Sequence, residues 1–321
     1  MTDNVLRVEM RAIAYEKHGD INVLEAVTLP KPTIRDGQVL VRVRAFGLNP
    51  LDYRLRRGEL KAITGMRSTK LIGSDFAGII ESVGSHVHGF SIGDSVFGMT
   101  FQPLAGCSAQ WIAVPSKQVA LMPSLPFKVS ASVPLAALTA YQALTELVSV
   151  EHGCRVLING ASGGVGTFAV QIARHYGAQV TAVTSFRNQS WMPELGAQRV
   201  IDYTKTDFAL EHNAFDVIFD CYGNRTFEAC HRALTQDGTY ISTIPALSRY
   251  RSVIFNRFRQ KQSKVVVVRA RGTQLHTIAS LIDAGVIKPI VERSYSFDDV
   301  HEAYRHLESK RTKGKLTVVV D

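Results

Sequence analysis

The sequence predicts an α/β chain of two domains, in which a β-rich domain is followed by a doubly wound parallel sheet. The chain has 321 residues, which exceeds what one hydrophobic core usually organises. Short apolar runs separated by turn residues dominate as far as Pro123, and strands alternate with helices after Pro126. With 45% hydrophobic and 20% charged residues, the composition is globular and excludes disordered and collagen-like classes.

The β-rich part is indicated by alternation and by punctuation. In Val39–Phe46, valines alternate with arginines, which is the period of a strand with one wet face. Gly73–Gly84 and Gly93–Gly98 are short apolar runs bounded by Gly and Asp, and Met10 opens a strand-like segment. Many short strands with frequent turns predict a barrel or a sandwich.

The second part alternates between the periods of strand and helix. Ser132–Val148 is apolar at helical spacing. The predicted strands are Arg155–Asn159, Gln179–Ser185, Phe215–Asp220, Gly238–Ile244 and Val265–Arg269, the last of them buried or paired, and the predicted helices are Val165–Tyr176 and Phe227–Leu234. A last helix is expected from Ser296, with Asp298 and Asp299 favoured by its dipole. Leu316–Val320 reads as a strand that returns to the first domain.

A glycine turn, Asn159–Gly166 (NGASGGVG), carries the strongest chemical signal. A predicted strand precedes it and an amphipathic helix follows, which is the context of a dinucleotide fingerprint. Glycines let the backbone approach a pyrophosphate, and the first N–H groups of the helix attract anionic oxygens. A tight turn without a ligand is the alternative, and the absence of a following GKS/T excludes a P-loop.

The choice of dinucleotide depends on the end of the next strand. An NAD site normally places an acid about 20 residues past the glycines, to bind the ribose 2′-hydroxyl. This chain has Ser185, Phe186 and Arg187 there and no carboxylate. A hydroxyl and a guanidinium favour the 2′-phosphate of NADPH, although Arg187 could also be an ordinary surface residue.

Several segments together resemble the zinc-independent quinone oxidoreductase branch of the medium-chain dehydrogenase/reductase superfamily. They are Asn49-Pro50-Leu51-Asp52 with Arg56 and Gly58, Gly73-Ser74-Asp75-Phe76-Ala77-Gly78, Phe90 with Gly93-Asp94, Thr139-Ala140-Tyr141-Gln142-Ala143-Leu144, the glycine turn, Asp202-Tyr203, and Gly314-Lys315-Leu316. The resemblance covers nearly the whole chain.

The resemblance implies a GroES-like β-barrel catalytic domain over residues 1–127 and 289–321. It implies a Rossmann NADPH-binding domain over residues 128–288. It also implies that Tyr203 lies beside the 2′-phosphate with Ser185 and Arg187. The cofactor-binding residues it implies are Thr139, Ser162, Gly163, Gly164, Val165, Ser185, Arg187, Tyr203 and Lys315.

The resemblance places Asn49, Asp52 and Tyr53 at the nicotinamide as catalytic candidates. Asn49 could bond the acceptor carbonyl or the nicotinamide ribose, whereas an Asx turn after Pro50 explains Asp52 equally well. Relatives often carry their substrate-contacting tyrosine later than Tyr53, and Arg54 stands at the neighbouring position. We expect catalysis by positioning, with the proton supplied by water or a pocket hydroxyl.

No metal site is expected. The zinc-dependent branch uses a cysteine where this chain has Asn49 and a histidine where it has Ser74, and its structural zinc needs four cysteines. Only Cys107 falls in that region; a small buried residue is the favoured interpretation of it, over a reactive thiol. His86 and His88 form an HxH pair without other ligands, which is typical of a solvated turn.

The leading hypothesis is therefore an NADPH-dependent reductase of quinones or α,β-unsaturated carbonyls. The alternatives are a zinc-free alcohol or enoyl reductase, and an NADPH-binding sensor with little turnover. The formal charge is 37 − 28 = +9, and Ser248–Lys264 carries six basic residues and no acid. A nucleic-acid surface is disfavoured because this block has few aromatic residues and matches no recognised module.

The remaining expectations concern partners and compartment. No apolar run is long enough to span a membrane, and the first residues do not resemble a secretory signal. Four cysteines without a CxxC pair indicate reduced thiols of a cytoplasmic protein. We expect a homodimer that pairs through the edge of Val265–Arg269.

Overall fold

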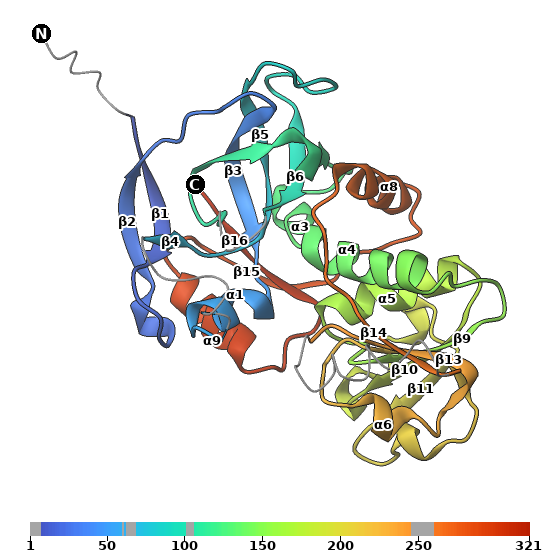
Figure 1. Ribbon diagram of the computed structural model, residues 1–321. Helices are drawn as coiled ribbons and strands as arrows, with labels where there is room; N and C mark the ends of the chain where they lie inside the picture. The colour runs from blue at the N-terminus through green and yellow to red at the C-terminus, as the bar shows by residue number, and fades with distance from the viewer. Residues whose placement is uncertain (1–7, 60, 62–68, 101–105, 245–259) are drawn as a thin grey trace, which may run out of the picture. The chain divides into compact units, whose positions relative to one another are not determined.

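The computed structural model describes residues 8–59, 61, 69–100, 106–244 and 260–321. The chain divides into two compact units (Figure 1). The first comprises Met1–Leu135, Ala270–Asp283 and Val291–Asp321, and the second comprises Ala136–Arg269 and Ala284–Ile290. The predicted boundaries after residues 127 and 288 fall slightly earlier, and they assign Ala270–Asp283 to the other domain.

Two β-sheets frame the first unit. A seven-stranded sheet has the order β15-β16-β3-β5-β6-β8, with β7 paired to β3, and a three-stranded sheet has the order β2-β1-β4. The strands are β1 (Glu9–Tyr15), β2 (Glu25–Pro30), β3 (Gln38–Gly47), β4 (Lys70–Leu71), β5 (Asp75–Val83), β6 (Ser95–Met99), β7 (Trp111–Pro115), β8 (Val119–Leu121), β15 (Val291–Tyr295) and β16 (Lys315–Val319).

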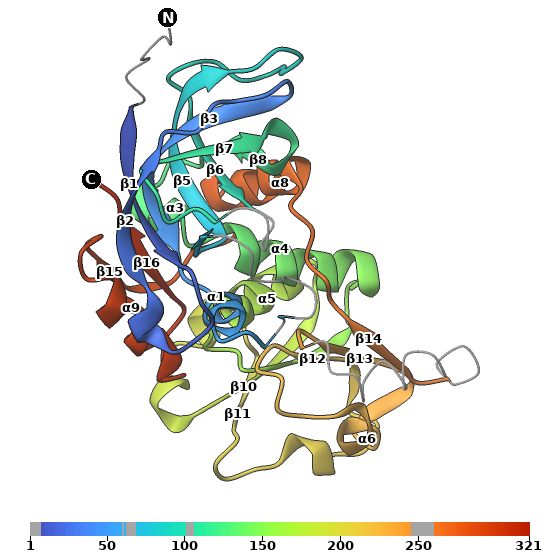
Figure 2. The same cartoon turned by 60° about the vertical axis from the view of Figure 1, so that its left-hand side comes forward.

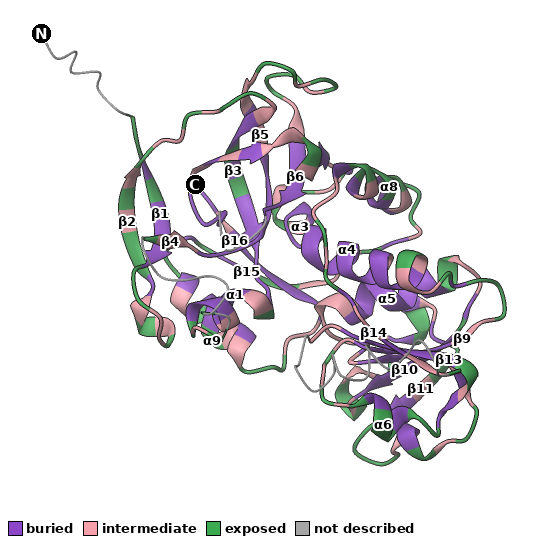
Figure 3. Cartoon of the chain, in the orientation of Figure 1, coloured by how far each residue is buried: buried purple, intermediate pink, exposed green. Residues whose placement is uncertain are grey.

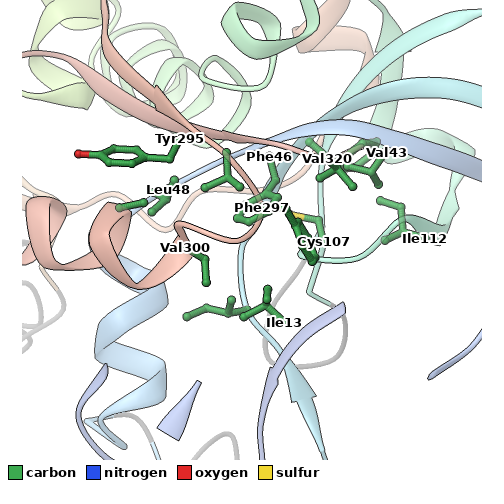
Figure 4. Packing of buried hydrophobic residues seen from close by; sticks show 14 of the residues in the cluster. Ile13, Val43, Phe46, Leu48, Cys107, Ile112, Tyr295, Phe297, Val300 and Val320 are labelled. Carbon is green, nitrogen blue, oxygen red and sulfur yellow. The ribbon is translucent and has the colours of Figure 1, made fainter. Parts of the chain in front are cut away.

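The alternation of valine and arginine along β3 decides which face of this sheet is buried. Val41 and Val43 are buried while Arg42 and Arg44 are exposed, as the period of two predicts. The buried faces enclose one apolar cluster, in which the rings of Phe46 and Phe297 meet edge to face with centroids 6.4 Å apart (Figure 4). This core holds the strand ends that carry the polar residues described below.

The C-terminal strand β16 completes the sheet of the first unit, as predicted. It pairs antiparallel with β3 and parallel with β15. In the described part of this unit, the helices are α1 (Pro50–Arg56), α3 (Phe127–Ser130), α8 (Gly272–Asp283) and α9 (Val300–Glu308), with short 3-10 turns at Ile21–Val23 and Ser116–Gln118. Helix α1 packs against α9, so residues about 250 positions apart meet.

The second unit is a parallel sheet of six strands. Their order is β11-β10-β9-β12-β13-β14, and β12, β13 and β14 run side by side in Figure 2. The strands are β9 (Arg155–Asn159), β10 (Gln179–Thr184), β11 (Arg199–Asp202), β12 (Phe215–Asp220), β13 (Leu234–Ser242) and β14 (Gln262–Val265). The order reverses between β9 and β12, and doubly wound sheets bind ligands at the carboxyl ends of strands next to such a switch point.

Helix α5 (Gly164–His175) covers the sheet beside that switch point. Its side chains Phe168 and Ile172 are fully buried, and Figure 3 shows most of α5 and the central strands as buried. The other helical segments are α4 (Pro134–Gln142), which begins in the first unit, a π-helix at Ala143–Leu147, α6 (Phe227–Cys230), and 3-10 turns at Phe186–Asn188, Pro193–Leu195 and Phe208–Leu210. None of the helices in the described ranges is both long and apolar enough to cross a membrane.

Four predicted elements are wrong in their bounds by more than one residue. The strand predicted at Gly238–Ile244 is β13, which runs from Leu234 to Ser242. The strand placed at Val265–Arg269 is β14, Gln262–Val265, because its partner β13 ends at Ser242 opposite Val265. The predicted helix Phe227–Leu234 is a single turn, and Leu234 already belongs to β13.

The last helix begins at Val300 rather than Ser296. The Ser296 hydroxyl accepts a bond from the Asp299 N–H at 3.2 Å and donates to the Asp299 carboxylate at 2.6 Å. It therefore closes a local turn before the helix. Of the basic segment Ser248–Lys264, residues 248–259 lie outside the described residues.

Candidate functional site

The glycine turn of the second unit joins β9 to α5 with the geometry of a phosphate cradle. Gly160 has a φ of +80°, which favours glycine. A Cβ on Gly166 would lie 2.2 Å from the Gly160 carbonyl oxygen, so α5 can approach β9 this closely only without a side chain there. Among the described residues, a Cβ on Gly163 would meet only that same oxygen, at 3.4 Å, so this position faces open space.

The donors of this turn fit a diphosphate. Gly163 is the N-cap of α5, so the N–H groups of Gly164 and Val165 have no acceptor within the helix. The Ser162 hydroxyl accepts bonds from Thr184 Oγ1 at 2.9 Å and Asn188 Nδ2 at 3.2 Å. Because its oxygen is the acceptor in both bonds, its own hydrogen is left for a third group, such as a phosphate oxygen. These residues therefore fit the diphosphate of a dinucleotide.

The adjacent ends of β10 and β11 bring together the residues predicted to choose the dinucleotide. Thr184 pairs with Asp202, and the Tyr203 N–H donates to the Thr184 carbonyl at 3.2 Å. Beyond these strand ends, Tyr203 and Arg187 are exposed and Ser185 is half-buried.

The carboxylate at this corner, Asp202, points inward. It is 7% exposed, and its Oδ1 accepts bonds from the N–H and the hydroxyl of Thr204, at 3.0 and 2.8 Å. These bonds lower the pKa of Asp202, so its charge is retained but is bound by its own turn. Within the described residues of these two strand ends, no acid is therefore exposed toward a ribose diol.

Two predicted cofactor residues belong to other elements. Thr139 is buried on α4, within the second unit. Lys315 opens β16 in the first unit, where its ammonium is fully engaged, as described below. Asn188, which binds Ser162, was missed by sequence reasoning because a lone amide in a turn carries no motif.

At the switch point, a buried carboxylate at the end of β12 binds the neighbouring strands and the loop that follows. Asp220, the last residue of β12, accepts bonds from the Asn159 side chain at 2.9 Å, from the N–H groups of Gly223 and Arg225, and from the Tyr240 hydroxyl. These bonds fix the loop after β12 beside the glycine turn. The ring of Tyr222 in that loop is 53% exposed.

In the first unit, the predicted catalytic turn is the start of α1. Asn49 precedes the helix in extended conformation, with Pro50 at its first position, where a missing N–H costs nothing. The Asp52 carboxylate accepts the Asn49 N–H at 2.8 Å. Asp52 thus closes a capping box at the start of α1, which differs from the Asx turn considered for it but is likewise a structural role.

Asn49 belongs to a buried polar cluster with Asp75 and Lys315. Its Nδ2 donates to Asp75 Oδ2 at 2.9 Å, and its Oδ1 accepts from Lys315 Nζ. The same ammonium donates to the Leu48 carbonyl at 2.8 Å and to Asp75 Oδ2 at 3.3 Å. The Lys315 ammonium therefore has three acceptors, and the side-chain amide of Asn49 is fixed in orientation.

The cluster is almost completely removed from solvent. Asp75 is 0% and Lys315 4% exposed, and Asp75 Oδ1 accepts the Leu135 N–H at 2.6 Å. Burial raises the pKa of Asp75, and the Lys315 charge opposes that rise. Asp75 reaches Asn49 only through the pairing of β5 with β3, which puts it opposite Gly47. Spacing along the sequence could not reveal that contact.

Asp52 has the most perturbed carboxyl group of this turn. It is fully buried, and desolvation with help from the Asp75 charge raises its pKa to about 7, against bonds that stabilise the ionised form. One of those bonds comes from the Tyr304 hydroxyl of α9 at 3.3 Å, and Asp52 Oδ1 has no partner among the described residues. Tyr304 was also missed, because it lies 252 positions away.

Helix α1 is held to α9 by a second polar contact one turn further on. The fully buried Arg56 forms an ion pair with Glu308, which also binds Arg57. Tyr53, between these contacts, is 8% exposed with the Arg57 guanidinium 5.3 Å from its ring. The structure thus places Asn49, Asp52 and Tyr53 together, but with their side chains inside the unit.

No metal-binding group of three or more His, Cys, Asp or Glu side chains occurs in the part of the chain that the structure describes. His86 and His88 are exposed in the turn after β5. Cys107 is buried and its thiol donates to the Asp75 carbonyl at 3.1 Å, and burial raises its pKa. That environment is unreactive toward electrophiles.

Two family models match this chain. Residues 35–124 match the alcohol dehydrogenase GroES-like domain, and residues 195–318 match the zinc-binding dehydrogenase model. The matches cover β3 to β8 of the first unit, and β11 to β14 of the parallel sheet with the C-terminal return as far as β16.

Whole-length relatives agree with the domain matches. The chain is 33% identical over 322 residues to 2-methylene-furan-3-one reductase of Solanum lycopersicum, and 31% identical to the NADPH-dependent alkenal/one oxidoreductase, chloroplastic, of Arabidopsis thaliana, each over 97% of this chain and 79% of the relative. The solved quinone oxidoreductase from Coxiella burnetii superimposes with a TM-score of 0.88 at 30% identity, over 98% of this chain and 100% of that one.

A GroES-like β unit, a Rossmann sheet of order 3-2-1-4-5-6 and a diphosphate-shaped glycine turn define a nicotinamide-dependent dehydrogenase/reductase. With these relatives, the chain belongs to the medium-chain dehydrogenase/reductase superfamily, in its zinc-independent quinone oxidoreductase branch.

Proposed function

We propose that this protein uses NADPH to reduce quinones or α,β-unsaturated carbonyls, without zinc. The observation that carries the choice of NADPH is the corner at β10 and β11, where Arg187 is exposed and the carboxylate of Asp202 is turned inward. A guanidinium attracts a 2′-phosphate, whereas an exposed acid would repel it.

Different residues of the second unit bind different parts of the dinucleotide. The N–H groups of Gly164 and Val165 and the hydroxyl of Ser162 bind the diphosphate. Ser185, Arg187 and Tyr203 bind the phosphorylated ribose. When bound, the dinucleotide supplies the hydride of the reaction.

On the acceptor side, Asn49 is the residue that presents a fixed donor. Its amide has two N–H bonds, of which Asp75 takes one. Asn49 is 2% exposed, so a carbonyl oxygen or the nicotinamide ribose would have to reach the second N–H at the buried start of α1. Lys315 and Asp75 hold that amide in one orientation, so little entropy is lost when a ligand binds. Thr139 is also proposed to contact the cofactor, because the resemblance to the quinone oxidoreductase branch implies it.

Zinc is not required for this chemistry. A quinone or an enone is already electrophilic, so hydride addition does not need the Lewis acid that alcohol oxidation uses. Asn49 and Ser74 stand where the zinc-dependent branch has a cysteine and a histidine, and neither is a good zinc ligand. The proton comes from water or a pocket hydroxyl.

Steady-state turnover tests the proposal. NADPH oxidation is followed with a benzoquinone and with a 2-alkenal, and NADP⁺ reduction is followed with a primary alcohol, each with and without a chelator. The proposal expects turnover with the quinone or the alkenal that the chelator leaves unchanged. Turnover only with the alcohol would favour the alcohol reductase, and NADPH binding without turnover would favour the sensor; either result contradicts the proposal.

We infer that the protein works in the cytoplasm. None of the four cysteines forms a disulfide, which supports a reducing compartment. Cell fractionation with antibody detection tests this, and enrichment in an organelle would contradict it.

A further inference from the structure

The exposed corner of the second unit holds a cation that the proposed function does not yet use. Lys205 lies in the turn after β11, and its backbone N–H donates to the Asp202 carbonyl at 3.0 Å. Its Nζ lies 5.3 Å from the centroid of the Phe186 ring, which is 70% exposed. The ammonium is therefore held above the three-residue turn that also carries Arg187.

This turn is tied to the diphosphate cradle. Asn188 donates from its side chain to the Ser162 hydroxyl at 3.2 Å, and its N–H donates to the Ser185 carbonyl at 2.9 Å. Asn188, which binds Ser162, therefore shares the turn Phe186–Asn188 with the ring that Lys205 covers. A group on the ribose of a dinucleotide bound at Ser162 comes to this side of the sheet.

The two exposed charged residues of this corner, Arg187 and Lys205, are both positive. Neither Ser185–Met192 nor Tyr203–Thr206 contains an acid, and Asp207 is ion-paired with Arg225 at 2.9 Å. The Lys205 charge also helps to keep Asp202 ionised and lowers its pKa, so Lys205 offsets the negative charge nearest the ribose. Without Lys205, that charge would oppose a second anion.

A ribose phosphate carries nearly two negative charges at neutral pH, because its second pKa is about 6. Arg187 supplies one positive charge, and a second cation is needed to balance the dianion. An exposed cation–π contact is weak, so Lys205 can leave the ring for a stronger, charge-assisted bond to phosphate.

We propose that Lys205 is a specificity-determining residue, which with Arg187 binds the 2′-phosphate of the dinucleotide and so favours the phosphorylated form. This inference rests on the proposed use of NADPH. It adds a residue outside the predicted set, found only because β10 and β11 end side by side.

The test measures binding of 2′,5′-ADP, 5′-AMP, NADPH and NADH by calorimetry to the full chain and to Lys205→Met. Methionine keeps an unbranched apolar side chain over Phe186 but removes the charge. We expect 2′,5′-ADP and NADPH to bind about tenfold more weakly, or worse, with 5′-AMP and NADH unchanged. Lys205→Arg restores most of the affinity, and the exposed Lys117→Met in the first unit changes nothing.

The outcomes separate the two proposals. If the wild-type protein prefers NADPH and Lys205→Met keeps the full preference, the role of Lys205 is wrong and the proposed cofactor stands. If the wild-type protein shows no preference, the proposed cofactor is wrong and the role of Lys205 is wrong with it. Equal thermal unfolding of both proteins shows that the variant is folded.

Discussion

Asp52 shows how burial can decide the protonation state of one residue. The folded state raises the pKa of its carboxyl from 3.8 to about 7, so folding favours the protonated form. Stability from this group is therefore complete below about pH 4 and is lost as the pH rises through 7. The full loss is about 4 kcal/mol, from three pKa units at 1.36 kcal/mol each.

The variant Asp52→Asn tests this residue. Its amide oxygen can still accept the Asn49 N–H and the Tyr304 hydroxyl, while the titration disappears. Urea unfolding between pH 4 and pH 8 should show a smaller loss of unfolding free energy with rising pH than in the wild type. The variant should also keep most of its kcat, because Asp52 is buried and acts through the turn. Parallel pH profiles, or a kcat lower by several orders of magnitude, would refute this assignment.

Lys315 was predicted to bind the cofactor, and the structure shows it in a buried ion pair with Asp75. Removing one partner of such a pair leaves an uncompensated buried charge. Lys315→Met should therefore lower the unfolding free energy by about 3–5 kcal/mol, measured in urea. The matched double variant with Asp75→Asn should recover much of that loss. A single variant as stable as the wild type would contradict the structural role.

At the scale of elements, substitutions at two glycines near the start of α5 should have different effects, one on stability and the other on cofactor binding. A Cβ on Gly166 meets the Gly160 carbonyl at 2.2 Å, and one on Gly163 meets nothing closer than 3.4 Å among the described residues. Gly166→Ala should lower the melting temperature. Gly163→Ala should melt like the wild type but bind NADPH at least tenfold more weakly, because its methyl group fills the cradle. The reverse pattern would show that Gly163 does not face the ligand.

The bounds of an element could be predicted where a local pattern of apolar residues determines them. Strands β9 and β12 have the predicted bounds, because continuous apolar runs end at Asn159 and Asp220. The strand at Val265 was misplaced because a run of valines carries no register, and its position depends on pairing with β13. Asp75 and Tyr304 were missed for the same reason: their contacts with Asn49 and Asp52 arise from the pairing of β3 with β5 and of α1 with α9.

At the scale of the whole molecule, the parallel sheet leaves β14 at one edge of the described strands. An edge strand offers unpaired backbone groups to a second copy. We expect a homodimer, and light scattering at micromolar concentration should give twice the chain mass of 35.4 kDa. A proline at Ser263, in the middle of β14, should lower that mass to the monomer value. A wild-type mass of one chain would contradict the expectation.

The central claim is that the second unit binds a phosphorylated nicotinamide dinucleotide at Gly163–Val165 and at the ends of β10 and β11. Calorimetric titration of the wild-type protein with NADPH and NADH under the same conditions tests it most directly. We expect one site per chain and at least tenfold tighter binding of NADPH, because of the charge-assisted contact to the extra phosphate. Equal affinities would contradict the choice of cofactor, and no binding of either dinucleotide would contradict the site itself.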